Sequence, residues 1–407
     1  MAAVVADLTR ARLAAPPPLA LYVHVPWCLR KCPYCDFNSH EAREVIPEAR
    51  YVDALVRDLE ASLPSVWGRR LHSVFIGGGT PSLFAPASID RLLAAVRARI
   101  PVEPGAEVTL EANPGTFEAE RFRGYREAGV NRLSLGVQSF DDRRLAAIGR
   151  VHGADEARRA LAAALETFGN VNVDLMYALP GQDLAGALAD LGEAMAAGAP
   201  HVSAYHLTLE PNTLFHRHPP ELPDEDAAAD MQEAIEAALA AGGWEHYETS
   251  AFARAGMRSR HNFNYWTFGD YLGLGAGAHG KISSAEGIRR EARVRQPKAY
   301  LEAVGRGAAI EEAREVDAAS LPFEFMLNAL RLVEGFPAAL FAERTGLAIT
   351  AIARELERAE AEGLLERGPA RIVPTAKGRR FLNVLLERFL PGTGAPSSAS
   401  GDTSRRS

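Results

Sequence analysis

Three cysteines lie within eight positions near the start of the 407-residue chain, and no other cysteine is present: Cys28, Cys32 and Cys35. Their spacing is C-x-x-x-C-x-x-C. A four-iron cluster that is bound entirely by protein needs one thiolate at each iron. Three thiolates leave one iron open, and an open position lets a small molecule bind a metal centre directly. The spacing therefore predicts a [4Fe-4S] cluster with one iron available to a second ligand.

Two alternatives exist for these cysteines. A Cys3His zinc site would use His24 or His40 as its fourth ligand. Three unrelated thiols are the other alternative, but clustering of every cysteine of the chain in one short loop makes chance a poor explanation. We favour the iron–sulfur cluster. An odd number of cysteines in one loop also excludes a disulfide framework and is typical of a reducing cytosol.

The composition is that of an ordinary soluble protein, with 47% hydrophobic and 24% charged residues. A net charge of −7 argues against a general nucleic-acid binder. No apolar run approaches the roughly 20 residues that span a bilayer, and the N-terminus lacks the pattern of a secretory signal. We expect a cytoplasmic protein without a transmembrane segment or a nucleic-acid partner. Peripheral contact with a membrane stays open.

The first half of the chain alternates short apolar runs with longer helical patterns. Strands are expected at residues 21–26, 72–76, 107–112, 132–137, 171–178 and 201–208. Helices of 10–20 residues between them predict parallel β-α units with right-handed crossovers. Ligands of such sheets bind beyond the carboxyl ends of the strands.

Polar and glycine residues stand at those strand ends. Gly77–Thr80 follow the second strand, Glu111 lies in the third, Gln138 follows the fourth, and Asp174 lies in the fifth. The glycines either form a tight turn or let the backbone approach a ligand closely. An unpaired carboxylate in an apolar strand is costly. Glu111 and Asp174 are therefore expected either to pair with Arg132 or Arg150, or to bind hydroxyl or amino groups of a ligand.

The second half reads as mostly helical. We expect one strand at residues 244–252, a close-packed glycine loop at 271–280, and a small β-wing at 364–373, so that this end resembles a winged-helix module. The helices are expected at residues 227–241, 299–304, 320–332, 337–344, 349–361 and 376–389. Gly275-x-Gly277-x-x-Gly280 matches a dinucleotide-binding pattern, but it does not open a long helix, and we reject that interpretation. His261 is either a packed histidine that caps a turn or an axial haem ligand.

Six sequence segments carry a resemblance to a known family over residues 21–389. They are VHVPWCLRKCPYCDF, FIGGGTPS, EANP, LSLGVQSF, VNVDLMYALPGQ and HNFNYW. The cysteine spacing with an aromatic residue before the last cysteine resembles the radical S-adenosylmethionine (SAM) superfamily. Together the segments resemble the oxygen-independent coproporphyrinogen III oxidase-like family, and within it the branch of haem chaperones.

The resemblance implies a fold, cofactors and contacts. The fold would be α/β, a partial (β/α)6 barrel with a helical, winged-helix-like C-terminal domain. The boundaries would be residues 1–20 for a lead-in, 21–250 for the barrel, 251–390 for the C-terminal domain and 391–407 for a disordered tail. A [4Fe-4S] cluster would be held by the three cysteines and SAM, and haem would be bound with His261 as candidate ligand. The implied SAM contacts are Tyr22, Tyr34, Gly78, Gly79, Thr80, Glu111, Gln138, Arg150 and Asp174.

Two departures from the oxidases of this family favour the chaperone branch. Those enzymes carry a further cysteine two positions after the triad, where this chain has Phe37, and a longer arm before it, where this chain has 27 residues before Cys28. The first hypothesis is a chaperone that delivers haem to apo-haemoproteins. The second is an enzyme that oxidatively decarboxylates coproporphyrinogen III through a SAM-derived radical. The sequence leaves open whether SAM is consumed.

Overall fold

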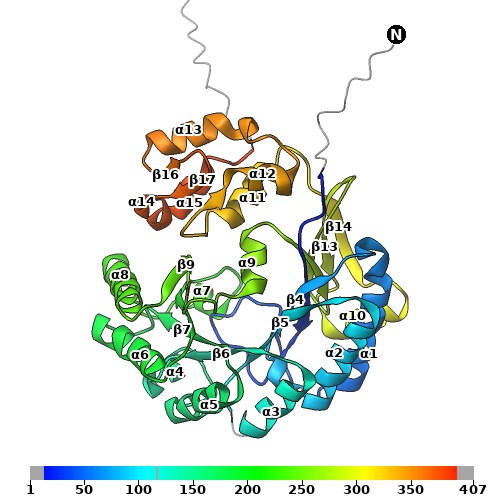
Figure 1. Ribbon diagram of the computed structural model, residues 1–407. Coiled ribbons are helices and arrows are strands. Elements are labelled where there is room, and N and C mark those ends of the chain that lie inside the picture. The colour runs from blue at the N-terminus through cyan, green and yellow to red at the C-terminus, as the bar shows by residue number, and fades with distance from the viewer. Residues whose placement is uncertain (1–12, 116–117, 392–407) are drawn as a thin grey trace, which may run out of the picture.

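The computed structural model describes residues 13–115 and 118–391. Six parallel strands form the centre of its largest sheet and occur in sequence order (Figure 1). They are β1 (Leu19–Val25), β4 (Leu71–Gly78), β5 (Val102–Ala112), β6 (Arg132–Gln138), β7 (Val171–Tyr177) and β8 (His201–His206). The predicted partial barrel of six β-α units is therefore confirmed.

Helices cover the outer face of this sheet (Figure 1). The alternation of side chains along each strand explains this arrangement. On β4, Val74 and Ile76 join the main apolar core beneath the helices, whereas Ser73 and Phe75 point to the inside of the barrel and contact His261. The covering helices are α1 (Glu48–Ser62), α2 (Pro86–Arg99), α3 (Glu118–Ala128), α4 (Asp142–Ala147), α5 (Ala154–Thr167), α6 (Leu184–Ala196) and α8 (Glu225–Ala241).

The barrel interior is polar and is closed at one end by helix α9 (Arg260–Trp266). Glu107 on β5 accepts hydrogen bonds from the backbone N–H groups of Arg260 and His261, both at 3.0 Å. These N–H groups belong to the first turn of α9, where no partner exists within the helix. Glu107 Oε2 also lies 4.0 Å from Nε of the fully buried Arg132. One carboxylate therefore caps the helix and offsets a buried cation.

Four strands of the second half extend the sheet, so the expectation of a mostly helical second half was wrong here. They are β11 (Asp270–Leu274), β12 (His279–Ser284), β13 (Gly287–Arg293) and β14 (Ile310–Glu315). Helix α10 (Pro297–Gly305) lies between β13 and β14, and the other predicted helices of the C-terminal end follow β14. β11 pairs in parallel with β1, and β12–β14 continue antiparallel. Buried charges hide the alternation in the sequence: Lys281 is paired with Asp270 at 2.9 Å, and Arg293 with Asp58 at 3.3 Å.

Two smaller expectations also need correction. The strand expected at residues 244–252 is a hairpin of β9 (Glu245–Glu248) and β10 (Ala251–Ala253), and β10 pairs antiparallel with β8. The glycine segment does follow a strand, β11, but Gly275 and Gly277 have positive φ angles of 102° and 76° and turn the chain into β12. Because no helix begins there, the rejection of a dinucleotide site stands.

The C-terminal part has the order helix, strand, two helices, two strands, and its small sheet has the strand order β15-β17-β16. This order confirms the predicted winged-helix-like module. Its elements are α11 (Leu321–Ala329), β15 (Phe336–Pro337), α12 (Ala338–Thr345), α13 (Ala353–Ala361), β16 (Leu365–Arg367), β17 (Arg371–Pro374), α14 (Ala376–Arg380) and α15 (Leu382–Glu387).

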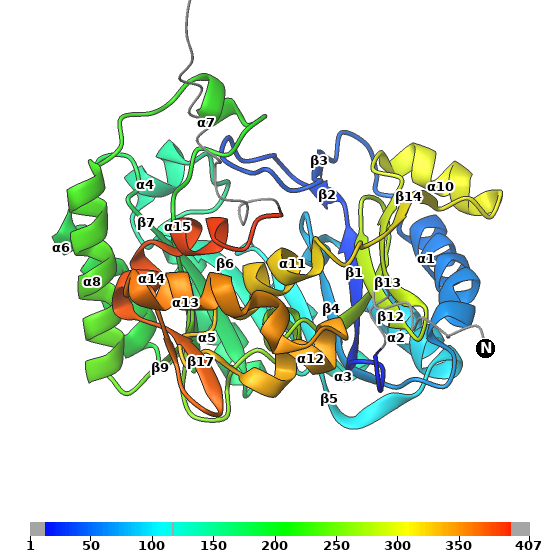
Figure 2. The same cartoon turned by 90° about the horizontal axis from the view of Figure 1, so that it is seen from above.

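This module lies above α9 and β9 in Figure 1 and extends across the barrel when seen from above in Figure 2. The backbone N–H of Thr249 donates to the carbonyl of Arg331 at 3.0 Å and ties the two parts together. The large sheet continues as far as Glu315, and the boundary after residue 250 stays a prediction. The predicted tail, except Pro391, and most of the lead-in lie outside the described residues. In the described part, no helix is both long and apolar enough to cross a membrane.

The shared contacts of Glu107 lead to a stability prediction. Glu107→Ala should lower the free energy of unfolding by roughly 3–5 kcal/mol, because it leaves a buried arginine and two helix N–H groups without their partner. Glu103→Ala on the same strand is the matched control, since Glu103 is less buried. Thermal and denaturant melts of both variants measure the difference. Equal stability of the two variants would contradict the assignment.

Candidate cofactor site

The three cysteines lie on the loop between β1 and α1. The two ends of this loop are held together because β2 (Trp27–Cys28) pairs with β3 (His40–Glu41). Lys31 Nζ donates to the carbonyl of Phe37 at 3.0 Å and stabilises the loop between them. Cys28, Cys32 and Cys35 all line one cavity of about 370 Å³ at the carboxyl ends of the parallel strands. This is the end of the barrel at which ligands of such folds bind.

A polar group lies beside each cysteine sulfur. Thr80 Oγ1 donates to Cys28 Sγ at 3.5 Å, and Arg150 Nη1 donates to Cys32 Sγ at 3.7 Å. Ser39 Oγ lies 3.7 Å from Cys35 Sγ. Burial raises the pKa of Cys28 and of Cys35, and these hydroxyl groups oppose the rise. Donors placed at the sulfur atoms stabilise thiolates, so the residues present fit an iron–sulfur cluster.

The zinc alternative fits less well. His24, one of its two expected fourth ligands, uses both ring nitrogens: Nδ1 is hydrogen bonded to the Tyr22 hydroxyl at 2.8 Å and Nε2 to the carbonyl of Asn38 at 2.9 Å. Among residues 13–115 and 118–391, no three His, Cys, Asp or Glu side chains converge as the ligands of a single metal ion do. The geometry favours a cluster, whose thiolates each bind a different iron.

The glycines after β4 are required by close contacts. Gly78 has a φ of 114°, and a Cβ there would lie 2.6 Å from the His24 ring. A Cβ on Gly79 would lie 2.5 Å from the carbonyl oxygen of Trp27. Only glycine avoids both problems. The segment is therefore a packed turn against the cluster loop, and its backbone also forms part of the cavity wall.

Two half-buried carboxylates face the same cavity, and neither forms an ion pair with a residue that the structure describes. Glu111 accepts a hydrogen bond from the Gly78 N–H at 3.0 Å, and Asp174 accepts from Ser134 Oγ at 3.1 Å and Asn172 Nδ2 at 2.8 Å. The structure pairs neither carboxylate with Arg132 or Arg150. Burial, and then repulsion from Asp174, raises the pKa of Glu111 to about 8. Carboxyl groups with raised pKa values in a cavity are typical of functional sites.

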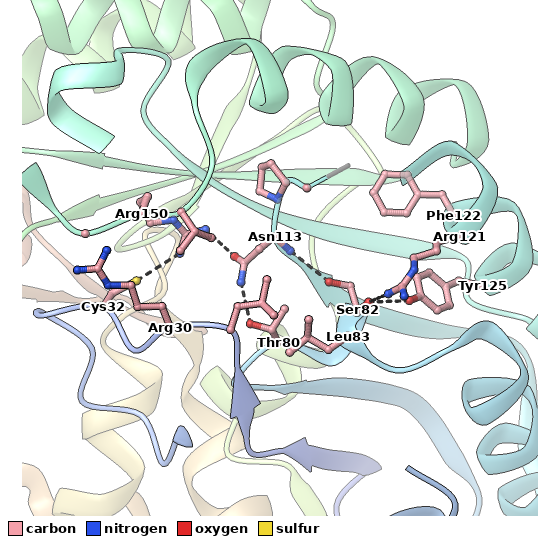
Figure 3. Close-up of a pocket in the computed structure, with 15 residues that line it drawn as sticks. Arg30, Cys32, Thr80, Ser82, Leu83, Asn113, Arg121, Phe122, Tyr125 and Arg150 are labelled. Carbon is pink, nitrogen blue, oxygen red and sulfur yellow. Dashed lines mark hydrogen bonds between the residues drawn. The ribbon is translucent and has the colours of Figure 1, made fainter. Parts of the chain in front are cut away.

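Arg150 is engaged with cavity groups instead. Its Nη2 donates to Asn113 Oδ1 at 2.6 Å and to the carbonyl of Gly136 at 2.7 Å. Asn113 Nδ2 in turn donates to Thr80 Oγ1 at 2.9 Å. Figure 3 shows this chain of hydrogen bonds from Cys32 to Thr80 in an adjoining pocket of about 250 Å³. The sequence prediction omitted Asn113, although its position directly after the third strand was a usable signal.

The remaining predicted contacts divide into two groups. Tyr34 and Gln138 line the cavity. Gln138 ends β6 with a φ of 70°, a strained backbone conformation that is uncommon for a residue other than glycine. Tyr22 does not line it and stacks on Phe75 at 6.3 Å between ring centroids. The cavity therefore brings together the three cysteines and eight of the nine implied SAM contacts.

His261 also lies apart from the cavity. It is 1% exposed, and its ring nitrogens are hydrogen bonded to Ser73 Oγ and to the Tyr265 hydroxyl, both at 3.1 Å. Burial lowers its pKa to about 3. Neither ring nitrogen is free to bind iron in this conformation. Its assignment as a haem ligand stays a prediction, and it requires at least one of these two hydrogen bonds to break.

Comparisons with known proteins agree with this arrangement. The radical SAM superfamily matches residues 22–191, and the HemN C-terminal domain matches residues 316–381. Heme chaperone HemW of Escherichia coli (strain K12) is 48% identical over 379 residues, which cover 92% of this chain and 98% of that protein. The HemW of Haemophilus influenzae is 47% identical over 380 residues, with the same coverage of 92% and 98%.

A solved structure has the same fold. The coproporphyrinogen III oxidase HemN of Escherichia coli, described as a radical SAM enzyme, superposes with a TM-score of 0.78 at 23% identity, covering 92% of this chain and 90% of that one. A radical SAM domain implies a [4Fe-4S] cluster and SAM, and the thiols and carboxylates of the cavity suit both.

The cluster assignment predicts the behaviour of single-cysteine variants. Changing Cys28, Cys32 or Cys35 to Ala should each abolish stable [4Fe-4S] assembly, because two thiolates hold the cluster poorly. Iron and sulfide analysis after anaerobic reconstitution measures this. His40→Ala is the control: it should retain the full cluster, whereas a zinc site that used His40 would lose its metal. Full iron occupancy in all three cysteine variants would overturn the assignment.

The raised pKa of Glu111 predicts how SAM affinity depends on pH. Below about pH 8 the side chain is mostly protonated. Donors on SAM bind the charged carboxylate better, so affinity should rise by up to roughly tenfold per pH unit as the pH approaches 8 from below. Calorimetric titration of the reconstituted protein measures this rise.

Glu111→Gln is the matched control for that titration, because it retains the shape of the side chain and removes its charge. Any slope that remains in this variant comes from SAM or the cluster. The assignment of Glu111 as a SAM contact fails if the variant and the wild type give parallel curves.

Proposed function

Because the chain belongs to the HemW family of haem chaperones within the radical SAM superfamily, we propose that it binds haem, carries a [4Fe-4S] cluster with SAM, and passes haem to apo-haemoproteins. The observation that carries the proposal is the similarity to named heme chaperones over nearly the whole length of both chains. The geometry of the cavity supports the cofactor part. The recipients are defined here only as apo-haemoproteins, and a cytoplasmic location stays a prediction.

The cavity supplies groups of the right chemistry for both cofactors. Cys28, Cys32 and Cys35 would hold three irons, and the fourth would be left to SAM. When bound, a reduced cluster supplies an electron for one-electron chemistry on SAM. Glu111 and Asp174 are half-buried and form no ion pair with any described residue, and SAM carries positive charge and hydroxyl groups. Binding of SAM would give these carboxylates the partners that the protein does not provide.

The other proposed SAM contacts surround these groups. Gly78 and Gly79 would let the backbone approach the ligand, and Thr80, Gln138 and Arg150 would donate hydrogen bonds from the cavity wall. Tyr34 would pack against the ligand. Tyr22 lies behind the cavity and would act through His24, to which its hydroxyl is bonded.

The second candidate function is oxidative decarboxylation of coproporphyrinogen III. It rests on the likeness of fold to HemN, which at 23% identity extends to the fold alone. Phe37 stands where the oxidases of the family carry a cysteine, and its ring is 60% exposed at the cavity. A bulky apolar ring has no acid-base or redox chemistry to offer in place of a thiol. We therefore favour the chaperone.

One anaerobic sample tests the two functions against each other. The reconstituted protein with SAM should bind haem, seen as a shifted Soret band, and transfer it to an apo-haemoprotein such as apomyoglobin. It should give no measurable turnover of coproporphyrinogen III. HemN assayed in parallel is the positive control for turnover. Production of protoporphyrinogen IX at enzymatic rates together with an unchanged Soret band would reverse the conclusion.

A further inference from the structure

A second large cavity, of about 500 Å³, separates the barrel from the C-terminal module. On one side it is lined from β7, β8, β10 and α8, and on the other from α14 and α15. In Figure 1, α14 and α15 lie directly above α8 and β9. We call this cavity the interdomain cleft. It is large enough to accept an extended, flat ligand between the two parts of the molecule.

His206 joins the interdomain cleft to the cofactor cavity. It is the last residue of β8, and its ring lines both cavities. Its side chain is exposed and contacts the Tyr177 ring, with 5.4 Å between centroids. Within the described residues, neither of its nitrogens has a hydrogen-bond partner. Partial loss of solvent lowers its pKa below the usual value, so the ring is neutral and free to bind a metal at neutral pH.

Other histidines of the barrel are not available in this way. His201 uses Nδ1 with Asn172 Oδ1 at 2.6 Å and Nε2 with the Tyr247 hydroxyl at 2.8 Å. His261 is buried with both nitrogens bonded, as described above. His206 differs from both, because its ring has no hydrogen bond among the described residues and lies on a cavity wall.

Apolar residues line both walls of the interdomain cleft, but only those of the C-terminal module expose much apolar surface. Ile235 and Phe252 lie on the barrel side, and Phe381, Leu382 and Val384 on the side of the C-terminal module. Phe381 is 49% exposed and Val384 38% exposed, which is unusual for such side chains in one place. Exposed apolar groups gathered in one concave surface indicate a ligand that covers them.

Two arginines of α14, Arg379 and Arg380, stand in the same cleft. Arg380 forms an ion pair with Glu233 on α8. Arg379 donates only to the carbonyl of Pro374, at 3.3 Å, so its charge has no carboxylate partner among the described ion pairs. A guanidinium group is well suited to a bidentate contact with a carboxylate. The cleft therefore offers an iron ligand, apolar walls and a carboxylate-binding group within one space.

We propose that haem binds in the interdomain cleft, with His206 as its iron ligand, its macrocycle against Phe381 and Val384, and a propionate on Arg379. This inference rests on the proposed function, since it assigns the site of the haem that the family is named for. It places the haem edge beside the cofactor cavity, because His206 belongs to both. Binding forms one iron–nitrogen bond and requires no change of oxidation state.

The test uses the full-length protein, reconstituted with its cluster and SAM and titrated with haemin. His206→Ala should weaken haem binding by roughly tenfold or more and shift the Soret band, because the iron–imidazole bond is lost. His218→Ala is the matched control, since His218 is exposed and outside the interdomain cleft. It should titrate as the wild type does. Thermal melts and iron content confirm that each variant is folded.

A second pair of variants makes the test independent of the iron ligand. Arg379→Glu should weaken haem binding by repelling the propionate, whereas Arg367→Glu, on β16 and outside the interdomain cleft, should leave it unchanged. If His206→Ala and Arg379→Glu both titrate as the wild type while His261→Ala loses the Soret band, the cleft is the wrong site and the chaperone function stands. If the wild type itself gives no saturable haem binding, the proposed function fails together with the site.

Discussion

Two half-buried carboxylates, Glu111 and Asp174, lie in one cavity with three thiols, and neither forms an ion pair within the described part of the chain. Hydrogen bonds from the Gly78 N–H, Ser134 and Asn172 stabilise the charged forms only in part, because burial still raises both pKa values. A site of this kind is costly in the free protein. A ligand that brings positive charge and hydrogen-bond donors reduces that cost. Part of the free energy that was lost on burying the carboxylates then contributes to the affinity for the ligand. The charge of SAM suits this need.

At the opposite end of the barrel, polar side chains bond to other protein groups instead of facing an open cavity. Glu107 caps α9 and lies near Arg132, and His201 is bonded to Asn172 and Tyr247. Glu107 and His201 are hydrogen bonded to other protein groups there, whereas Nε and Nη2 of Arg132 have no hydrogen-bond acceptor, and α9 closes the interior. The barrel therefore has one sealed polar end, which confers stability, and one open polar end, which is left for ligands. His261 belongs to the sealed end, and this explains why neither of its nitrogens is free.

Strand β8 connects the open end to the C-terminal module. Ser203 on this strand donates a hydrogen bond to Asn172 in the barrel interior, and Tyr205 lines the cofactor cavity. His206 at the end of the strand reaches the interdomain cleft. The winged-helix-like module is held by a backbone hydrogen bond from Thr249 to Arg331 close to this cleft. A ligand between the two parts would contact the same strand end as a ligand in the cofactor cavity. Two ligands of different chemistry would then meet at a single residue, His206.

Local features of the sequence determined much of this protein. The cysteine loop, the glycine turn and the six parallel strands could be predicted because their signals lie within a few consecutive residues, and parallel topology then collects the strand ends on one side. The winged-helix-like module was also predictable from its helices and its wing. The same reasoning placed Glu111, Gln138 and Asp174 at the end of the sheet where the cavity lies.

Tertiary structure alone decided the rest. Strands β11–β14 were missed because Lys281 and Arg293 are buried by ion pairs, and the partner of Arg293, Asp58, is more than 200 positions away, so an apolar alternation is not visible locally. The position of His261 depends on Glu107, a residue of a different strand that caps its helix. His206 gains its place only because the C-terminal helices fold back over β8. In each case the deciding contact joins residues far apart in the chain, and no local pattern records such a contact.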